Sequence, residues 1–325
     1  MRNVLFISPD FFGHYKTIAA AISRKGLNPI WLNQLPATNI LTRILFRFAP
    51  KIGYSWADRY FSREMEKHQF VELILIVKGE GVSAATIAKM RQNYPNAKIV
   101  LYLWDSLANS FGALDKIRLC DIAYSFDPLD CDRNQSLKHL PMFYSEKVES
   151  PAYIQGYAAF IGTLHSNRYQ LIKLIGAEIE RVTSIKPFLY FYYPNRVVFM
   201  ILRLVKRGLR GIKLSDVHFE PVPRAQYDTI QAEAEIIIDI SHPKQSGLTM
   251  RPFEALGAGR KLITNNKIIM RYDFYRPENC YVIDGALNED FTYFLNSAYQ
   301  PYPPALVEKY HVDSWLETLL SSAEA

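Results

Sequence analysis

Three charged side chains, Lys244, Arg251 and Glu254, lie within one short stretch of the sequence, residues 238–266. Lysine and arginine side chains can neutralise a phosphate group, and an arginine guanidinium matches phosphate geometry with paired hydrogen bonds. The carboxylate of Glu254 could accept hydrogen bonds from two neighbouring sugar hydroxyls. Together these side chains predict a site for a ligand that carries both phosphate and sugar. The alternative is that Glu254 merely suits the first turn of a helix and that Arg251 is a solvated neighbour.

The elements around these side chains form a strand, loop, helix and strand. The apolar run 236–240 predicts a buried parallel strand, residues 242–247 predict a polar turn, and residues 261–264 predict the next strand. Thr249 is placed to cap the helix between them. A helix N-terminus offers free N–H groups and a partial positive charge to a phosphate, and in such a unit it lies at the carboxyl edge of the sheet.

The same stretch resembles the nucleotide-sugar half-site of GT-B glycosyltransferases of the "glycosyl transferases group 1" kind, which act in capsule and lipopolysaccharide biosynthesis. The resemblance is carried by Glu254 and Ala255, by Gly257 and Gly259, and by the strand 262–264. It implies that Glu254 binds the ribose of a donor nucleotide. The second glutamate of the family pattern, eight residues earlier, is replaced here by Ser246, next to Gln245.

The resemblance also implies a fold and a set of donor-binding residues. The expected fold is α/β, with two Rossmann-like domains facing a cleft and a C-terminal helix that crosses back to the first domain. The expected domains are residues 1–147 for the acceptor, 148–305 for the nucleotide sugar, and 306–325 for the returning helix. Donor binding is expected from the following residues: Gly162, Arg168, Lys244, Gln245, Ser246, Gly247, Arg251 and Glu254.

The first half of the chain alternates strands with helices, which predicts a parallel sheet covered on both faces. The strands are expected at 4–8, 30–33, 71–77, 99–104 and 122–126, with helices at 15–25, 83–93 and 108–118. No G-x-G-x-x-G follows the first strand, which argues against a dinucleotide. Residues 138–156 are expected to be a linker, because they contain Pro141 and Pro151 and few periodic apolar positions.

Polar residues follow several of these strands and should share one rim of the sheet. They include Lys78 and Glu80. Asp105 is the first choice for a catalytic residue that activates an acceptor hydroxyl, and Asp10 and His14 are the next choices. The alternative for each aspartate is a turn or helix cap. The sequence leaves open whether a sugar would be transferred with inversion or with retention of configuration.

Composition excludes several other classes of protein. The three cysteines have neither metal-binding spacing nor an even number, so no metal site, no disulfide framework and a reducing cytoplasm are expected. The sequence shows no signal peptide and no run of about 18 apolar residues that would predict a membrane-spanning helix. Nucleic-acid binding is disfavoured, because the basic residues lie in apolar helices. We expect no cofactor beyond the nucleotide-sugar substrate.

Two basic segments with many apolar residues predict a peripheral membrane location. Residues 194–213 contain six lysines and arginines and no acidic residue, and residues 41–63 contain five against Asp58 alone. Cationic amphipathic helices of this kind lie at membrane interfaces. The alternative is that both are core helices whose basic ends reach solvent. We therefore expect a cytoplasmic protein on the inner face of the membrane, bound to an anionic surface.

The function expected from these observations is metal-independent transfer of a sugar from a nucleotide-sugar donor to a glycan or lipid-linked glycan acceptor. Two alternatives stay open. A nucleotide-sugar epimerase has the same architecture and would act on the donor alone. A non-catalytic glycan-assembly subunit is conceivable because Ser246 replaces the expected glutamate.

Overall fold

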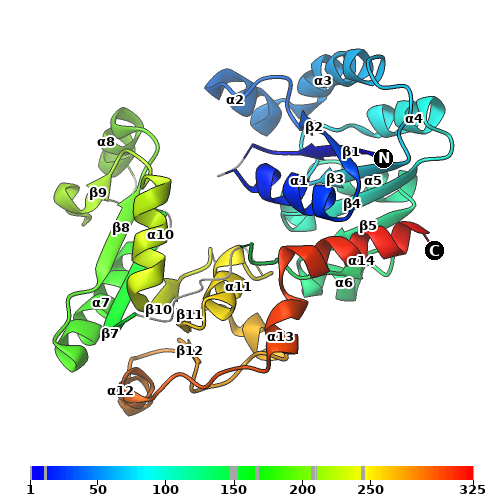
Figure 1. Ribbon diagram of the computed structural model, residues 1–325. Helices are drawn as coiled ribbons and strands as arrows, with labels where there is room; N and C mark the ends of the chain where they lie inside the picture. The colour runs from blue at the N-terminus through cyan, green and yellow to red at the C-terminus, as the bar shows by residue number, and fades with distance from the viewer. Residues whose placement is uncertain are drawn as a thin grey trace. The chain divides into compact units, whose positions relative to one another are not determined.

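The computed structural model describes residues 2–10, 13–145, 153–164, 168–205, 209, 211–242 and 246–324. The chain divides into two compact units (Figure 1). Unit 1 comprises Met1–Ser145 and Lys309–Ala325, and unit 2 comprises Glu146–Glu308. The chain therefore passes from unit 1 to unit 2 and returns to unit 1 at its end.

Unit 1 contains a parallel sheet with the strand order β2-β1-β3-β4-β5-β6. The central strands of this sheet are short apolar runs, as expected for strands that are buried on both faces. The predicted strands are confirmed with small shifts at their ends, and β6 is an additional strand. The strands are β1 (Asn3–Ser8), β2 (Asn28–Asn33), β3 (Leu73–Val77), β4 (Lys98–Leu103), β5 (Ile122–Ser125) and β6 (Lys138–His139).

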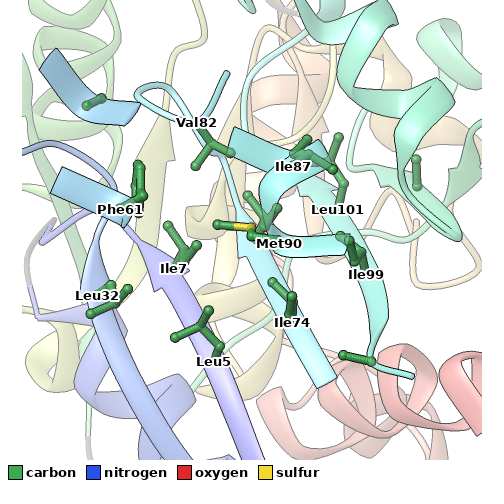
Figure 2. Close-up of a cluster of buried hydrophobic side chains, with 14 of the residues drawn as sticks. Leu5, Ile7, Leu32, Phe61, Ile74, Val82, Ile87, Met90, Ile99 and Leu101 are labelled. Carbon is green, nitrogen blue, oxygen red and sulfur yellow. The ribbon is translucent and has the colours of Figure 1, made fainter. Parts of the chain in front are cut away.

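The helices of unit 1 cover both faces of this sheet. Successive side chains of a strand point to opposite faces of the sheet. On one face, Leu5 and Ile7 of β1 belong to a cluster of buried side chains that also includes Ile87 and Met90 of α4 (Figure 2). The helices are α1 (His14–Arg24), α2 (Ile40–Phe48), α3 (Pro50–Met65), α4 (Ala84–Asn93), α5 (Ala113–Leu119), α6 (Pro128–Arg133) and α14 (Val312–Glu324), with a 3-10 turn at Leu107–Asn109. The predicted helix at 108–118 is thus a 3-10 turn followed by the shorter α5.

Helix α14 packs on β4 and α1 of unit 1, as predicted for a helix that crosses back to the first domain. The Trp315 ring meets the ring of Tyr102 edge-on at 4.9 Å and lies 4.7 Å from that of Phe143. Arg24 of α1 forms an ion pair with Asp313 at 2.5 Å.

The segment that leads out of unit 1 differs from the predicted linker. Residues 138–145 are part of unit 1: β6 pairs with β5, and Met142, Phe143 and Tyr144 are buried. The backbone of Tyr144 forms a parallel bridge with His311. The apolar side chains of this segment are buried without any helical or strand periodicity, so the sequence pattern did not indicate them.

Unit 2 contains a second parallel sheet, with the strand order β12-β11-β10-β7-β8-β9. The predicted strands at 236–240 and 261–264 are confirmed as the neighbours β10 and β11. The strands are β7 (Ile154–Thr163), β8 (Phe188–Tyr192), β9 (Val217–His218), β10 (Ala234–Asp239), β11 (Lys261–Thr264) and β12 (Cys280–Val282).

The helices of unit 2 again lie on both faces of the sheet. Ile172 and Ile175 of α7, Phe199 of α8 and Phe291 of α12 belong to one buried cluster, together with Ile236 of β10. Helices α10 and α11 contact the sheet through β10. The helices are α7 (Arg168–Thr183), α8 (Arg196–Val205), α10 (Arg224–Glu233), α11 (Met250–Gly257), α12 (Glu289–Asn296) and α13 (Pro304–Lys309). Among the described residues, no helix is both long enough and apolar enough to span a bilayer.

Candidate functional site

The strand order of unit 2 creates a switch point between β7 and β10. From β7 the chain adds β8 and β9 on one side, and it then returns to build β10, β11 and β12 on the other. The loops that follow β7 and β10 leave the sheet in opposite directions, and doubly wound sheets bind ligands in the crevice that this produces. Of the donor residues predicted from the sequence, Gly162 lies near the end of β7, and the others follow β7 or β10.

Arg168, the first residue of α7, is buried at this edge of the sheet. Its Nη1 donates a hydrogen bond to the carbonyl of Thr163 at 2.9 Å, and its Nη2 donates to the carbonyl of Ile240. The guanidinium thus connects the ends of β7 and β10. Gly162 makes room for it, because a Cβ at that position would lie 3.2 Å from Nη1 and 2.7 Å from the ring of Phe160.

Arg251, in the first turn of α11, is the second arginine at this edge. Its Nη1 donates to Asp239 Oδ1 at 3.2 Å, and its Nη2 donates to the carbonyl of Ile161 at 2.6 Å. Thr249 donates its hydroxyl proton to Asp239 Oδ2 at 3.0 Å. Thr249 occupies the N-cap position of α11, but its side chain makes no capping hydrogen bond. The predicted cap is therefore wrong, because the hydroxyl binds the buried carboxylate of Asp239 instead.

The two arginines and Asp239 together carry one net positive charge. Both guanidinium groups lie over the Phe160 ring, at 5.6 Å for Arg168 and 6.0 Å for Arg251. Burial lowers the pKa of Arg168 to about 10, an effect that Asp239 opposes and Arg251 reinforces. Burial is the largest single influence on Arg251 and acts to lower its pKa, but Asp239, Tyr227 and Glu254 together outweigh burial and raise that pKa. Both arginines are therefore cationic near neutral pH.

Three buried polar atoms at this edge have no hydrogen-bond partner within the part of the chain that the structure describes. They are Nε of Arg168, Nε of Arg251 and Oγ of Ser241. Buried donors are normally satisfied in folded proteins. Unsatisfied N–H donors beside a net positive charge are suited to an anionic ligand such as a phosphate.

Glu254, one turn further along α11, is half-buried and accepts a hydrogen bond from the Tyr227 hydroxyl at 3.1 Å. Tyr227 belongs to α10 and fixes one carboxylate oxygen of Glu254. The other predicted donor residues lie in the loop before α11. The carbonyls of Ser246 and Gly247 accept hydrogen bonds from Asn266 Nδ2 at 2.9 and 3.4 Å, while Lys244 and Gln245 lie outside the described residues.

Four residues of this site were missed by reasoning from the sequence: Asp239, Tyr227, Asn265 and Asn266. Asn265 fastens the start of the loop after β10, because its Oδ1 accepts a hydrogen bond from the Ser241 N–H at 2.8 Å. Asn266 fastens the other end of that loop. The signal was available, since both asparagines directly follow β11 and Asp239 ends β10, and so all three lie at the same sheet edge.

Unit 1 has its own switch point, between β1 and β3, and an ion-paired cluster lies beside it. Lys78 Nζ lies 3.1 Å from Asp105 Oδ2 and 3.5 Å from Glu80 Oε2. Burial acts to lower the pKa of Lys78, but the two carboxylates raise it. The predicted shared rim is therefore confirmed for Lys78, Glu80 and Asp105. Gln34, which follows β2, donates to Glu80 Oε2 at 3.4 Å and accepts from the Glu80 N–H at 3.0 Å.

The turn that presents Lys78 is held in an uncommon conformation. Lys78 and Gly79 both have positive φ, at 66° and 62°. The buried Lys116 of α5 donates a hydrogen bond to the Gly79 carbonyl at 2.8 Å. Gly81 packs so closely against the residue after β2 that a Cβ at position 81 would lie 2.1 Å from the Gln34 carbonyl oxygen. Close packing and a buried ammonium group thus fix the position of Lys78, and strained turns of this kind occur at functional sites.

The two remaining catalytic candidates are placed differently. The His14 ring lies 5.9 Å from the ring of Trp104, the residue before Asp105, so His14 is near the cluster. Asp10 is exposed after β1 and forms no hydrogen bond or ion pair with another described residue. The structure therefore brings His14 and Asp105 to the same region and does not connect Asp10 with them. No group of three or more histidines, cysteines, aspartates or glutamates among the described residues is placed to hold a metal ion.

No protein-family model matches this sequence, and no curated protein matches it. Solved structures do resemble it over almost the whole chain. The catalytic domain of starch synthase IV from Arabidopsis thaliana, bound to ADP and acarbose, is 10% identical, with a TM-score of 0.62 over 99% of this chain and 98% of that one. An alpha-glucosyltransferase in complex with UDP and DNA is 12% identical, with a TM-score of 0.59 over 99% and 96%. A putative UDP-N-acetylglucosamine 2-epimerase from Listeria monocytogenes is 11% identical, with a TM-score of 0.51 over 98% and 96%. The chain has the GT-B fold, built from two Rossmann-like α/β units, which it shares with these transferases and with the epimerase.

Proposed function

We propose that this protein is a glycosyltransferase that moves a sugar from a nucleotide-diphosphate donor to a glycan acceptor. The observation that carries the proposal is the buried cluster of Arg168, Arg251 and Asp239 at the switch point of unit 2. The cluster has a net positive charge, and two of its N–H donors have no partner among the described residues. A diphosphate supplies the negative charge and the acceptor oxygens that this cluster lacks.

We assign the donor to unit 2, with a separate role for each group of residues. Arg251 lies in the first turn of α11 and would bind the diphosphate together with the N–H groups of that turn. Arg168 donates to two backbone carbonyls, so it would act mainly through its charge and through its Nε–H. Lys244, Gln245, Ser246 and Gly247 would complete the phosphate and sugar contacts. Glu254, oriented by Tyr227, would accept hydrogen bonds from the ribose hydroxyls.

In the proposed reaction the bond between the sugar C1 and the diphosphate oxygen breaks, and a bond forms between C1 and an acceptor hydroxyl oxygen. The diphosphate leaves with the bonding electron pair, and fixed positive charge stabilises it as its own charge grows. The arginines can supply this charge, so we propose that no metal ion is required. The acceptor hydroxyl loses its proton to a base. Asp105 is the proposed base, with His14 and Asp10 as the alternatives.

We further propose that the acceptor is a lipid-linked surface glycan, as in lipopolysaccharide or capsule assembly, and that the protein works on the cytoplasmic face of the membrane. Helix α8 supports this location. Its outward side chains are apolar and exposed, with Val197 at 67%, Ile201 at 55% and Leu204 at 75%, although its Phe199 is fully buried. An exposed apolar helix face next to basic residues is typical of interfacial helices.

A second candidate function is epimerisation of a nucleotide sugar, which is favoured by the similarity to the putative 2-epimerase. An epimerase converts the donor without an acceptor and releases no free nucleoside diphosphate as a transfer product. The third possibility, a non-catalytic assembly subunit, rests on Ser246 in place of a glutamate. It would show neither reaction.

The experiment that tests the proposal has two steps. A thermal-shift panel of UDP, ADP, GDP, CMP and TDP, with their sugar derivatives, identifies the donor class, because a ligand that binds only the folded state raises the melting temperature. The nucleotide sugar that binds is then incubated with and without glycan acceptors. Release of nucleoside diphosphate that depends on an acceptor supports the transferase. Conversion of the sugar without an acceptor identifies the epimerase, and the absence of both reactions contradicts the proposal.

A further inference from the structure

Helices α2 and α3 of unit 1 are neighbours (Figure 1). Both carry large apolar side chains that are exposed. We call this surface the α2–α3 patch. Its apolar members lie on α2 and on the first turns of α3. They are Ile40 at 66% exposure, Leu41 at 73%, Ile44 at 48%, Phe48 at 80%, Ile52 at 67% and Trp56 at 41%.

These side chains are not misplaced core residues, because both helices already bury another face. Phe46 of α2 is only 4% exposed, and Ala57, Phe61 and Met65 of α3 are buried in the core of unit 1. Gly53 lets the two helices approach closely, since a Cβ there would lie 3.0 Å from the Phe46 ring. The inward faces are therefore filled, and the patch is a second apolar surface, which the described residues of unit 1 leave exposed.

Basic side chains flank the apolar surface, and acidic side chains are absent from it. Arg43, Arg47, Lys51, Arg59 and Arg63 are all exposed, and none forms an ion pair with another described residue. The one acidic residue between positions 40 and 63 is Asp58, whose carboxylate accepts hydrogen bonds from Ser83 Oγ at 2.6 Å and from Thr86 Oγ1. The negative charge of Asp58 is thus engaged at the junction with α4, and the patch presents cations only.

The order of side chains around α2 places the cations at the border of the apolar arc. At a helical turn of about 100° per residue, positions 40, 41, 44 and 48 fall within an arc of about 100°. Arg43 and Arg47 lie at one edge of that arc, and the buried Thr42 and Phe46 lie on the opposite side of the helix. A helix with this arrangement can insert its apolar side chains while its arginines extend to the surface.

We propose that the α2–α3 patch docks on a lipid bilayer that contains anionic phospholipids. Acyl chains would cover the six apolar side chains, and anionic headgroups would neutralise the five cations. A second copy of the chain does not fit, because pairing two such patches brings five cations against five. Nucleic acid would match the cations but would leave the aliphatic side chains uncovered. An acidic amphipathic segment of another protein is the alternative that the test must separate.

The proposal rests on the proposed function only for its purpose, which is to bring the enzyme to a lipid-linked acceptor. The full-length protein is sedimented with phosphatidylcholine vesicles and with vesicles that contain about one-third phosphatidylglycerol. We expect binding to the second kind only, and we expect it to weaken as salt rises. Phe48→Ser and Arg43→Glu/Arg47→Glu should each weaken binding by at least about tenfold.

Matched control variants test whether the effect is specific to the α2–α3 patch, because they change an exposed apolar residue and an exposed cation elsewhere in unit 1. Phe70 is 79% exposed in unit 1, and Arg118 of α5 is also exposed. Phe70→Ser and Arg118→Glu should bind vesicles like the wild type. Failure of the wild type to bind anionic vesicles overturns the proposal and leaves an acidic protein segment as the alternative occupant. Unchanged binding by Phe48→Ser, or equal binding to both kinds of vesicle, also overturns it.

The same proteins distinguish this proposal from the proposed function. Nucleotide binding is measured by thermal shift on every variant, and the patch variants should keep the wild-type response. Vesicle binding without nucleotide binding contradicts the transferase and leaves the docking surface intact. Nucleotide-dependent transfer without vesicle binding contradicts the docking surface alone.

Discussion

Arg251 and Asp239 form a buried ion pair, 3.2 Å from Nη1 to Oδ1, in which the arginine also reaches the backbone of β7. The side chain of Asp239 is 2% exposed and that of Arg251 is 19% exposed. The pair therefore connects the N-terminal turn of α11 to the two strands at the switch point of unit 2. We assign Arg251 to the donor diphosphate. The position of this arginine depends on the Asp239 carboxylate, which need not contact the ligand itself.

Asp239→Asn should destabilise the protein by about 3 kcal/mol, because it leaves the buried Arg251 guanidinium without its paired carboxylate and removes the negative charge near Arg168. Urea denaturation gives the free energy of unfolding. Asp284→Asn is the matched control, since Asp284 forms an exposed ion pair with Lys267 at 2.7 Å, and exposed pairs contribute little. If both variants lose similar stability, Asp239 does not hold the cluster together.

Glu254→Ala should weaken nucleotide binding by about 1.5–3 kcal/mol, because it removes hydrogen bonds to a charged carboxylate. Tyr227→Phe should have a smaller effect in the same direction, since it removes only the hydroxyl that orients Glu254. Isothermal titration with the nucleotide found by thermal shift measures both. Glu278→Ala, an exposed glutamate of unit 2, is the control. Unchanged affinity in Glu254→Ala would remove this residue from the site.

Asp105→Asn should lower turnover by about 100-fold or more, which is the lower range for general-base catalysis, while nucleotide affinity stays as in the wild type. The amide keeps the size of the side chain but cannot accept the proton. Initial rates at saturating donor measure the effect, with Asp115→Asn as the exposed control. Lys78→Met should change the pH dependence of turnover, because it removes the ammonium group paired with Asp105. Near-normal turnover in Asp105→Asn would leave this residue as a partner of Lys78 only.

The fully buried Lys261 of β11 should make the free energy of unfolding depend on pH in the alkaline range. Its Nζ donates to the carbonyls of Phe294 and Ser297 at the end of α12, and burial lowers its pKa from 10.5 to about 8. Between these two values the unfolded chain binds more protons than the folded protein, so the free energy of unfolding should rise with pH.

The pH effect of Lys261 is measured as the difference in unfolding free energy between the wild type and Lys261→Met, from about pH 7.5 to about pH 10. Lys116, whose pKa burial also lowers to about 8, is present in both proteins and cancels in this difference. Lys138→Met replaces an exposed lysine and should leave the pH profile unchanged. A difference that stays constant across the range contradicts the assigned titration of Lys261.

The sequence predicted the sheets well because buried parallel strands are short β-branched runs, as in Leu73–Val77 and Ala234–Asp239. It also predicted the helix that carries Glu254, because apolar residues recur at helical spacing between two predicted strands. It could not predict that Arg168 donates to the carbonyl of Ile240, 72 residues away, because that contact depends on the pairing of β7 with β10. The contacts between Lys78, Glu80 and Asp105 likewise depend on the strand order of unit 1.

The amphipathic segment 41–63 was recognised, but its division into α2 and α3 was not. Ala49 follows α2 with φ −136° and ψ 57°, which are not helical values, and Pro50 begins α3. Pro at a first helical position is favourable, so the break was readable from Pro50. Which apolar residues of the two helices face outward could not be read from the sequence, because the sequence does not reveal which side packs on the sheet.

The contact between Tyr102 and Trp315 has a consequence for the order in which the chain folds during synthesis. Tyr102 and Phe143 emerge from the ribosome long before Trp315, which covers both rings in the finished protein. All of unit 2 is synthesised between them. Unit 2 can therefore complete its core while one face of unit 1 is still open, and a nascent chain would expose that face until its last helix has been made.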